Sequence, residues 1–165
     1  MGVDYFWRRV AEGDVDGLGA AELYEVVPYW FDASFEYESD AGITVGTTDT
    51  AALMDKLLRL GAGGGADAES AWLTVDGADG VEDDMVGVLT GAQVVAVADF
   101  LSRAQPATWV HRFRAELSDT AQDVGYSRPF DDEWAQALVR DTEELTALFA
   151  KAASANESVI VKVVA

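Results

Sequence analysis

Cysteine is absent from this sequence, and histidine occurs once, as His111. Without cysteine the chain has neither a disulfide framework nor a thiol nucleophile, and the lack of thiols fits a reducing compartment. One histidine cannot supply a zinc-binding histidine pair, and any Ser-His-Asp triad would have to use it. His111 lies off the apolar stripe formed by Trp109, Val110 and Phe113, so we expect it at the surface and not as a general base.

Basic residues are scarce as well. The chain has 11 Lys and Arg against 30 Asp and Glu, which gives a formal net charge of −19. Such a surface repels a phosphate backbone, and no basic patch compensates for it, so we expect no binding to nucleic acid. The excess of acid is consistent with solubility alone, or with electrostatic attraction to a basic partner protein.

Long apolar runs are missing too. No segment approaches the roughly 20 apolar residues that a membrane-spanning helix needs. The first ten residues, "MGVDYFWRRV", lack the basic-then-apolar order of a signal peptide. We therefore expect a soluble, cytoplasmic protein with no membrane association. Half of the 165 residues are apolar, which is enough for one core, and we expect a single domain over residues 1–165.

Alternating apolar residues predict strands at both ends of the chain, "VDYFWRRV" (3–10) and "SVIVKVV" (158–164), and β-rich runs predict two more at 70–77 and 85–89. Helical periodicity predicts helices in the segments 20–28, 47–61, 89–104, 106–117, 118–124 and 131–156. This order indicates an α+β domain in which a small mixed or antiparallel sheet, including the N- and C-terminal strands, packs against several helices.

The segment "GYSRPFDDEW" (125–134) combines a tyrosine, a tryptophan, an arginine and three carboxylates. Asp131 is suited to cap a helix start, and carboxylates in the first turn are favoured by the helix dipole. We interpret the segment mainly as the end of one helix and the start of the next. The alternative is a ligand cluster made of Tyr126, Arg128, Asp131 and Trp134.

Two other stretches resemble ligand-binding motifs without meeting their requirements. "GAGGGA" (61–66) has dinucleotide-fingerprint spacing but follows a predicted helix instead of a strand, so we expect a flexible connector. "DGADGVEDD" (76–84) offers oxygen ligands, but its spacing departs from the calcium-loop pattern. We expect no metal site and no cofactor.

Aromatic residues crowd the first 37 positions. Burial in the core is the default interpretation for such residues. However, "VPYWFDASFEYE" interleaves aromatic and acidic side chains, and aromatic anchors are enriched at protein interfaces. The alternative is therefore a partner-binding surface, with Tyr29, Trp30, Phe35 and Tyr37 as the anchors.

The C-terminal half carries a family pattern: a short strand leading into "VLTGAQV", two helices, "VGYSRPFDDEW", a long amphipathic helix and a final apolar strand. The residues that match are Leu89, Thr90, Val94, Tyr126, Pro129 and Trp134, together with the aromatic Met-Gly strand at the start of the chain. The sequence resembles the YfbM-like bacterial family of unknown function. The resemblance implies a single α+β domain and no particular activity. Residues 47–61 lack the Trp-Asp pair that opens a middle helix in many members.

The leading functional hypothesis is a non-enzymatic protein-binding or regulatory module that engages a basic protein. One alternative is a small-molecule-binding domain with an apolar pocket between sheet and helices. The other is a carboxylate-dependent hydrolase or transferase using Asp83 or Asp131 with His111. We assign no catalytic residue, and the sequence favours a protein that is not an enzyme.

Overall fold

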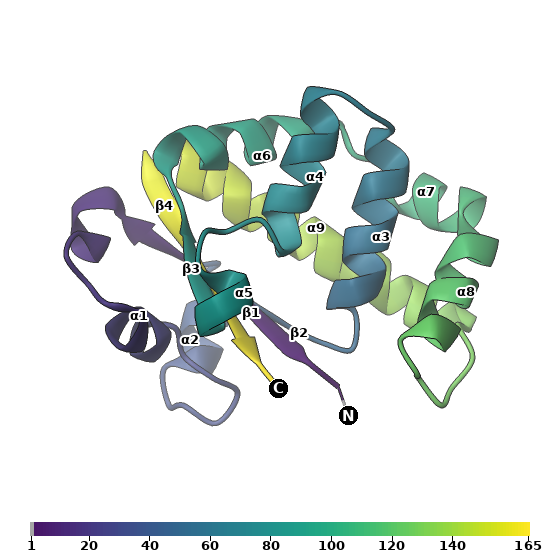
Figure 1. Ribbon diagram of the computed structural model, residues 1–165, viewed down its shortest axis with the longest axis horizontal. Coiled ribbons are helices and arrows are strands. Elements are labelled where there is room, and N and C mark those ends of the chain that lie inside the picture. The colour runs from purple at the N-terminus through teal and green to yellow at the C-terminus, as the bar shows by residue number, and fades with distance from the viewer. Residues whose placement is uncertain (1) are drawn as a thin grey trace.

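A four-stranded antiparallel sheet lies at the centre of the structure, a computed structural model that describes residues 2–165 (Figure 1). The strand order is β2-β1-β4-β3. The strands are β1 (Asp4–Ala11), β2 (Thr44–Thr48), β3 (Val86–Leu89) and β4 (Glu157–Val164). The N- and C-terminal strands therefore form the middle of the sheet, which confirms the expected α+β class and makes the sheet antiparallel throughout.

Helices lie on both faces of this sheet (Figure 1). In chain order they are η1 (Glu12–Val15), α1 (Ala20–Val26), α2 (Phe35–Asp40), α3 (Ala51–Ala62), α4 (Ala66–Val75), α5 (Val81–Asp84), α6 (Gly91–Arg103), α7 (Pro106–Arg112), α8 (Arg114–Asp123) and α9 (Asp132–Ser154). The larger helices gather on one face around α9, and α1 and α2 with their connections cover the other. None of the helices in the described part of the chain is long and apolar enough to cross a bilayer.

Side-chain alternation along the strands separates two cores. In β1, Trp7 enters the main core beneath the helices, while Phe6 enters the smaller core beneath α1 and α2. In β4, Val159 and Val161 face the main core, and Ile160 faces the smaller one. Burial on both faces explains why the last strand is an almost continuous apolar run.

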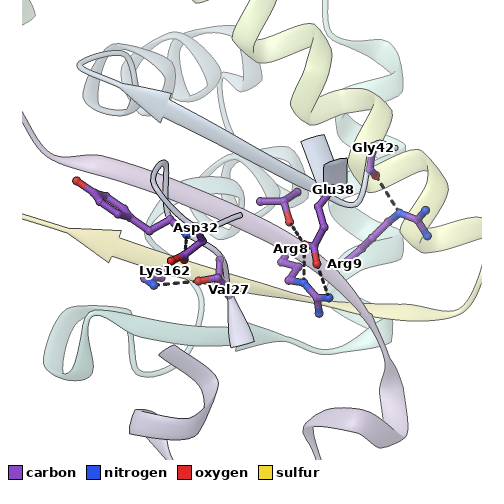
Figure 2. Close-up of polar contacts among 9 residues, drawn as sticks. Arg8, Arg9, Val27, Asp32, Glu38, Gly42 and Lys162 are labelled. Carbon is purple, nitrogen blue, oxygen red and sulfur yellow. Dashed lines mark hydrogen bonds and ion pairs between the residues drawn. The ribbon is translucent and has the colours of Figure 1, made fainter. Parts of the chain in front are cut away.

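Polar contacts hold the segment from α1 to β2 on the second face (Figure 2). The buried Lys162 Nζ donates to the Val27 carbonyl at 2.9 Å and lies 4.1 Å from the Tyr24 ring centroid. Burial lowers the pKa of the Lys162 ammonium. Arg8 donates two hydrogen bonds to Glu38, at 2.9 and 3.0 Å, and this pairing lowers the pKa of Glu38. The pair therefore stabilises the fold at neutral pH and stops doing so as the pH falls through the lowered pKa.

Several local predictions are confirmed. The helix expected over 89–104 is present as α6, and Thr90 and Gln93 form a capping box at its start. The Asp131 carboxylate caps α9, and α1 ends at Val26, just before Pro28.

Other local predictions are wrong. Residues 70–77, predicted as a strand, belong to α4 and the turn after it, and α4 buries Ala71 and Val75 against its neighbours. The β-branched Thr74 is accommodated because its hydroxyl donates to the Ser70 carbonyl one turn earlier. The predicted helix at 47–61 starts only at Ala51, because residues 44–48 pair with β1 as a strand that the sequence did not indicate. Similarly, the helix expected over 106–117 divides at Phe113 into α7 and α8.

Leu138, fully buried in α9, tests the main core. We expect Leu138→Ala to lower the free energy of unfolding by about 2–5 kcal/mol, because it removes buried methyl groups and leaves a cavity. Val95→Ala is the control: Val95 is 54% exposed on α6, and the change should stay within about 0.5 kcal/mol. Urea denaturation followed by circular dichroism measures both, and equal losses would contradict this placement of α9.

Candidate functional site

A cleft of about 420 Å³ opens at the outer edge of β2, and we call it the edge cleft. Four segments form it: the strand β2 with the turn after it, the loop between α8 and α9, the first three turns of α9, and one side chain from the second face of the sheet. Its lining residues are Trp30, Gly46, Thr47, Thr48, Asp49, Thr50, Tyr126, Ser127, Arg128, Glu133, Trp134, Ala137, Arg140 and Asp141.

The start of α9 fixes one wall of the edge cleft. Asp131 accepts a hydrogen bond from the Trp134 backbone N–H at 2.8 Å, and this bond lowers the pKa of the Asp131 carboxyl. The helix period then places Ala137 and Asp141 on the same face as Trp134. A helix cap that is readable in the sequence therefore sets the position of several cleft residues at once.

Aromatic side chains pack against neighbouring rings in the walls of the cleft. The Trp134 side chain is 4% exposed and packs edge-on against Tyr126, with ring centroids 4.9 Å apart. On the opposite side, the Trp30 indole N–H donates to Asp4 at 2.8 Å, and its ring packs on Phe6. Gly46 makes this possible, since a Cβ there would lie 2.7 Å from the Trp30 ring.

On the side of the cleft formed by β2 and the following turn, two buried polar atoms lack a hydrogen-bond partner within residues 2–165. Thr47 is 1% exposed, and its hydroxyl has no hydrogen-bond partner within residues 2–165. Asp49 adopts a left-handed backbone conformation with φ of 62°, and its buried Oδ1 is likewise unpartnered within that range. Burial, followed by the charge of Asp49, raises the pKa of the Tyr126 phenol. Buried polar groups without partners are rare, and sites that take up a ligand are one explanation for them.

A carboxylate lies deep in the same cleft. The Asp141 residue is 8% exposed, and its Oδ2 accepts a hydrogen bond from the Thr50 hydroxyl at 2.7 Å. Its Oδ1 lies 3.4 Å from Arg140 Nη2. The Asp141 carboxylate therefore has one short hydrogen bond, from Thr50, and one long contact, with Arg140.

The two arginines of the cleft are loosely paired. Arg128 Nη2 lies 3.3 Å from Asp131, and the guanidinium stacks 4.8 Å from the centroid of the Trp134 ring. Arg140 has only the 3.4 Å contact with Asp141 among its ion pairs. The five other arginines that form ion pairs in residues 2–165 do so at 2.7–3.1 Å, and these are Arg8, Arg9, Arg59, Arg103 and Arg114. Most N–H groups of the Arg128 and Arg140 guanidinium groups are therefore available to a ligand.

The structure brings together most of the ligand cluster proposed from the sequence. Tyr126, Arg128 and Trp134 line the edge cleft, while Asp131 lies behind them, capping α9 and contacting Arg128. The helix-start interpretation and the ligand-cluster interpretation therefore describe the same residues. Sequence reasoning missed Arg140 and Asp141, although their helical spacing from Trp134 was a usable signal.

The predicted partner surface divides in two. Tyr29, Trp30 and Phe35 pack around Phe6 in the smaller core. Tyr37 points outward and is 73% exposed. Phe31, in the same part of the sequence, is 87% exposed.

The residues of the enzyme alternative lie elsewhere. His111 is exposed on α7 and borders a shallow groove with α9, outside the edge cleft. Asp83 is exposed on the short helix α5. Across residues 2–165, no three or more His, Asp or Glu side chains are grouped so that they could hold a metal ion.

Comparison with known proteins supports the fold. No protein-family model matches the chain, and no curated protein matches its sequence. Among solved structures, it is similar to YfbM from Escherichia coli, a protein described as of unknown function. The two share 13% sequence identity and a TM-score of 0.61, over 98% of this chain and 99% of that one. The likeness shows the fold and confirms the architecture that the sequence resemblance implied.

Two matched substitutions test the polar part of the cleft. Thr50→Val should lower the free energy of unfolding by about 1.5–3 kcal/mol, because it removes the hydrogen bond to the nearly buried Asp141 carboxylate. Thr47→Val should be neutral or stabilising, because the hydroxyl it removes is buried and unpartnered. Both are measured by urea denaturation without added ligand. A loss for Thr47→Val as large as that for Thr50→Val would show that the Thr47 hydroxyl has a partner after all.

Proposed function

We propose that the protein is a non-enzymatic recognition domain that binds an anionic ligand in the edge cleft. The observation that carries this proposal is the pair of loosely paired arginines, Arg128 and Arg140, on the border of one cleft.

This observation has weight because of the composition of the chain. With 30 acidic residues and 11 basic ones, carboxylates are abundant partners for every arginine. Three arginines lack a short ion pair within residues 2–165: Arg112 is exposed on α7, whereas Arg128 and Arg140 both line the same cleft. A guanidinium presents a planar fork of donors that matches a carboxylate or phosphate, and such charge-assisted bonds are among the strongest that proteins make.

The remaining lining fits a ligand that is partly apolar. The half-buried Trp30 contributes an aromatic side chain to the lining, and the nearly buried Trp134 ring holds Arg128 by stacking. Thr47 and Asp49 also belong to the lining, each with a buried oxygen atom that has no hydrogen-bond partner within residues 2–165. The volume of about 420 Å³ lies within the range of small-molecule sites.

Binding of simple anions tests the proposal. We expect glutamate, citrate or inorganic phosphate at millimolar concentration to raise the thermal unfolding temperature, because a ligand of the native state stabilises it by mass action. Calorimetric titration should show affinity at least about tenfold weaker for Arg128→Gln and for Arg140→Gln, since each loses a charge-assisted hydrogen bond.

Arg112→Gln is the matched control, because Arg112 is exposed on α7 and lies outside the edge cleft. Its affinity for the same anion should stay within about twofold of the parent protein. Equal weakening of all three variants would indicate a general charge effect and would contradict a site in the edge cleft, as would the absence of any response to these anions.

A second candidate function rests on a different observation. Phe31 and Tyr37 expose most of their rings beside the acidic residues Asp32, Glu36 and Asp40. Large exposed aromatic side chains are uncommon away from interfaces, and the acidic surroundings complement a basic protein.

Affinity purification from the native host at low salt tests this candidate. We expect a basic protein that is released as the salt concentration rises and that is lost with Phe31→Ser, because the change removes an exposed aromatic anchor. Val95→Ser, at an exposed apolar position on α6, is the control and should retain the partner. Retention of the same protein by Phe31→Ser would argue against this surface.

A further inference from the structure

The two edges of the sheet differ in how they are covered. Beyond β3, Asp79 forms a bridge with Val88, so a connecting segment covers that edge. Beyond β2, the described residues contribute no further strand, and the edge cleft opens there. An uncovered strand edge is a template for pairing with another extended chain.

The hydrogen-bonding pattern shows which backbone groups of β2 point outward. In antiparallel pairing, residues alternate between hydrogen-bonded pairs and pairs whose backbone groups face away from each other. The Arg9 N–H donates to the Ile43 carbonyl at 3.0 Å, which makes Trp7/Val45 and Tyr5/Thr47 the hydrogen-bonded pairs. The pairs that alternate with these are Phe6/Gly46 and Asp4/Thr48. The N–H and C=O groups of Gly46 and Thr48 therefore face away from β1.

An independent contact supports this assignment. The Val163 N–H donates to the Met85 carbonyl, so odd-numbered residues of β4 face β3 and even-numbered ones face β1. The even-numbered residues of β1 consequently face β4, and the odd-numbered ones face β2. Gly46 and Thr48 also line the edge cleft, so their outward backbone groups border the same space as Arg128 and Arg140.

We propose that the ligand of the edge cleft is the C-terminal end of an extended peptide, which pairs with β2 and sets its carboxylate against Arg128 and Arg140. This inference rests on the proposed function and specifies its ligand. Strand addition explains the outward backbone groups of Gly46 and Thr48, which a small anion alone would leave unused.

The uncovered edge of β2 is short and bounded at both ends. It therefore favours the end of a bound peptide over a bound strand that continues past both ends of β2. At one end of β2, α2 lies against the strand, and the Thr44 hydroxyl donates to Glu38 at 2.7 Å. At the other end, Asp49 turns the chain into α3 through its left-handed conformation. The stretch 46–48 lines the edge cleft, where Arg128 and Arg140 offer donors to a terminal carboxylate alongside the acidic Asp49, Glu133 and Asp141.

Peptide binding tests this inference. The probe is an equimolar library of N-acetylated five-residue peptides with free C-terminal carboxylates, captured on the immobilised protein and identified by mass spectrometry. Retained peptides are then titrated singly by fluorescence anisotropy. We expect affinity to fall at least about tenfold when the C-terminal carboxylate is amidated, and to a similar extent when a pairing main-chain amide is N-methylated.

Variants of the strand supply the matched pair. Thr48→Pro removes one outward N–H and should weaken peptide binding at least about tenfold, while Thr48→Ala keeps that N–H and should bind as the parent does. Circular dichroism and the response to phosphate or citrate establish that Thr48→Pro is folded. The N-methylated peptide tests the same hydrogen bonds without altering the protein.

The outcomes separate this inference from the proposed function. If anions bind through Arg128 but no peptide is retained, the anion site stands and the peptide inference is overturned. If amidated or N-methylated peptides bind as well as the free acids, the inference is also overturned. A concentration-dependent dimer that Thr48→Pro abolishes would assign this edge to a second copy of the chain. If neither anions nor peptides bind, both proposals fail.

Discussion

The pairing of β1 with β4 is the constraint on which the rest of the structure depends. The two strands pair along their whole length, from Asp4 opposite Val164 to Ala11 opposite Glu157. Both strands are central, so both faces of each are covered, and each contributes to the main core and to the smaller core. Every other element is placed on one face of this pair or along one of its two edges.

The edge cleft follows from that arrangement. With β1 and β4 in the centre, the short strands β2 and β3 must take the edges, and only the edge of β2 borders a cleft among the described residues that also contains two loosely paired arginines. The helix α9 ends in a tight turn at Asn156 immediately before β4, so the strand pairing also fixes the helix. The position of Trp134, Arg140 and Asp141 beside β2 is thus a consequence of the sheet order.

Much of this fold could be predicted from local sequence patterns, and the failures have a common cause. Alternation predicts β1 and β4, helical periodicity predicts α6, and the capping residue Asp131 predicts the start of α9, because these signals act within a few residues. The sequence does not indicate β2, because "TVGTT" is short and overlaps the helix predicted over 47–61, so only its pairing with β1 makes it a strand. The sequence predicts a strand at 70–77, but these residues form part of α4, because packing against α3 and α6 overrides their β propensity. Similarly, the sequence indicated Tyr126, Arg128 and Trp134, but bringing them beside residues 46–50 requires the tertiary fold.

The separation of β1 and β4 along the chain has a consequence for synthesis. Arg9 of β1 and Glu157 of β4 form an ion pair although they are 148 positions apart in the sequence. A nascent chain emerging from the ribosome presents β1, with its apolar side chains on both faces, long before β4 exists to pair with it. Until then only β2 can protect one edge of β1, and the other edge remains exposed to aggregation. Pairing of strands so far apart in the sequence predicts slower folding than pairing of neighbouring strands.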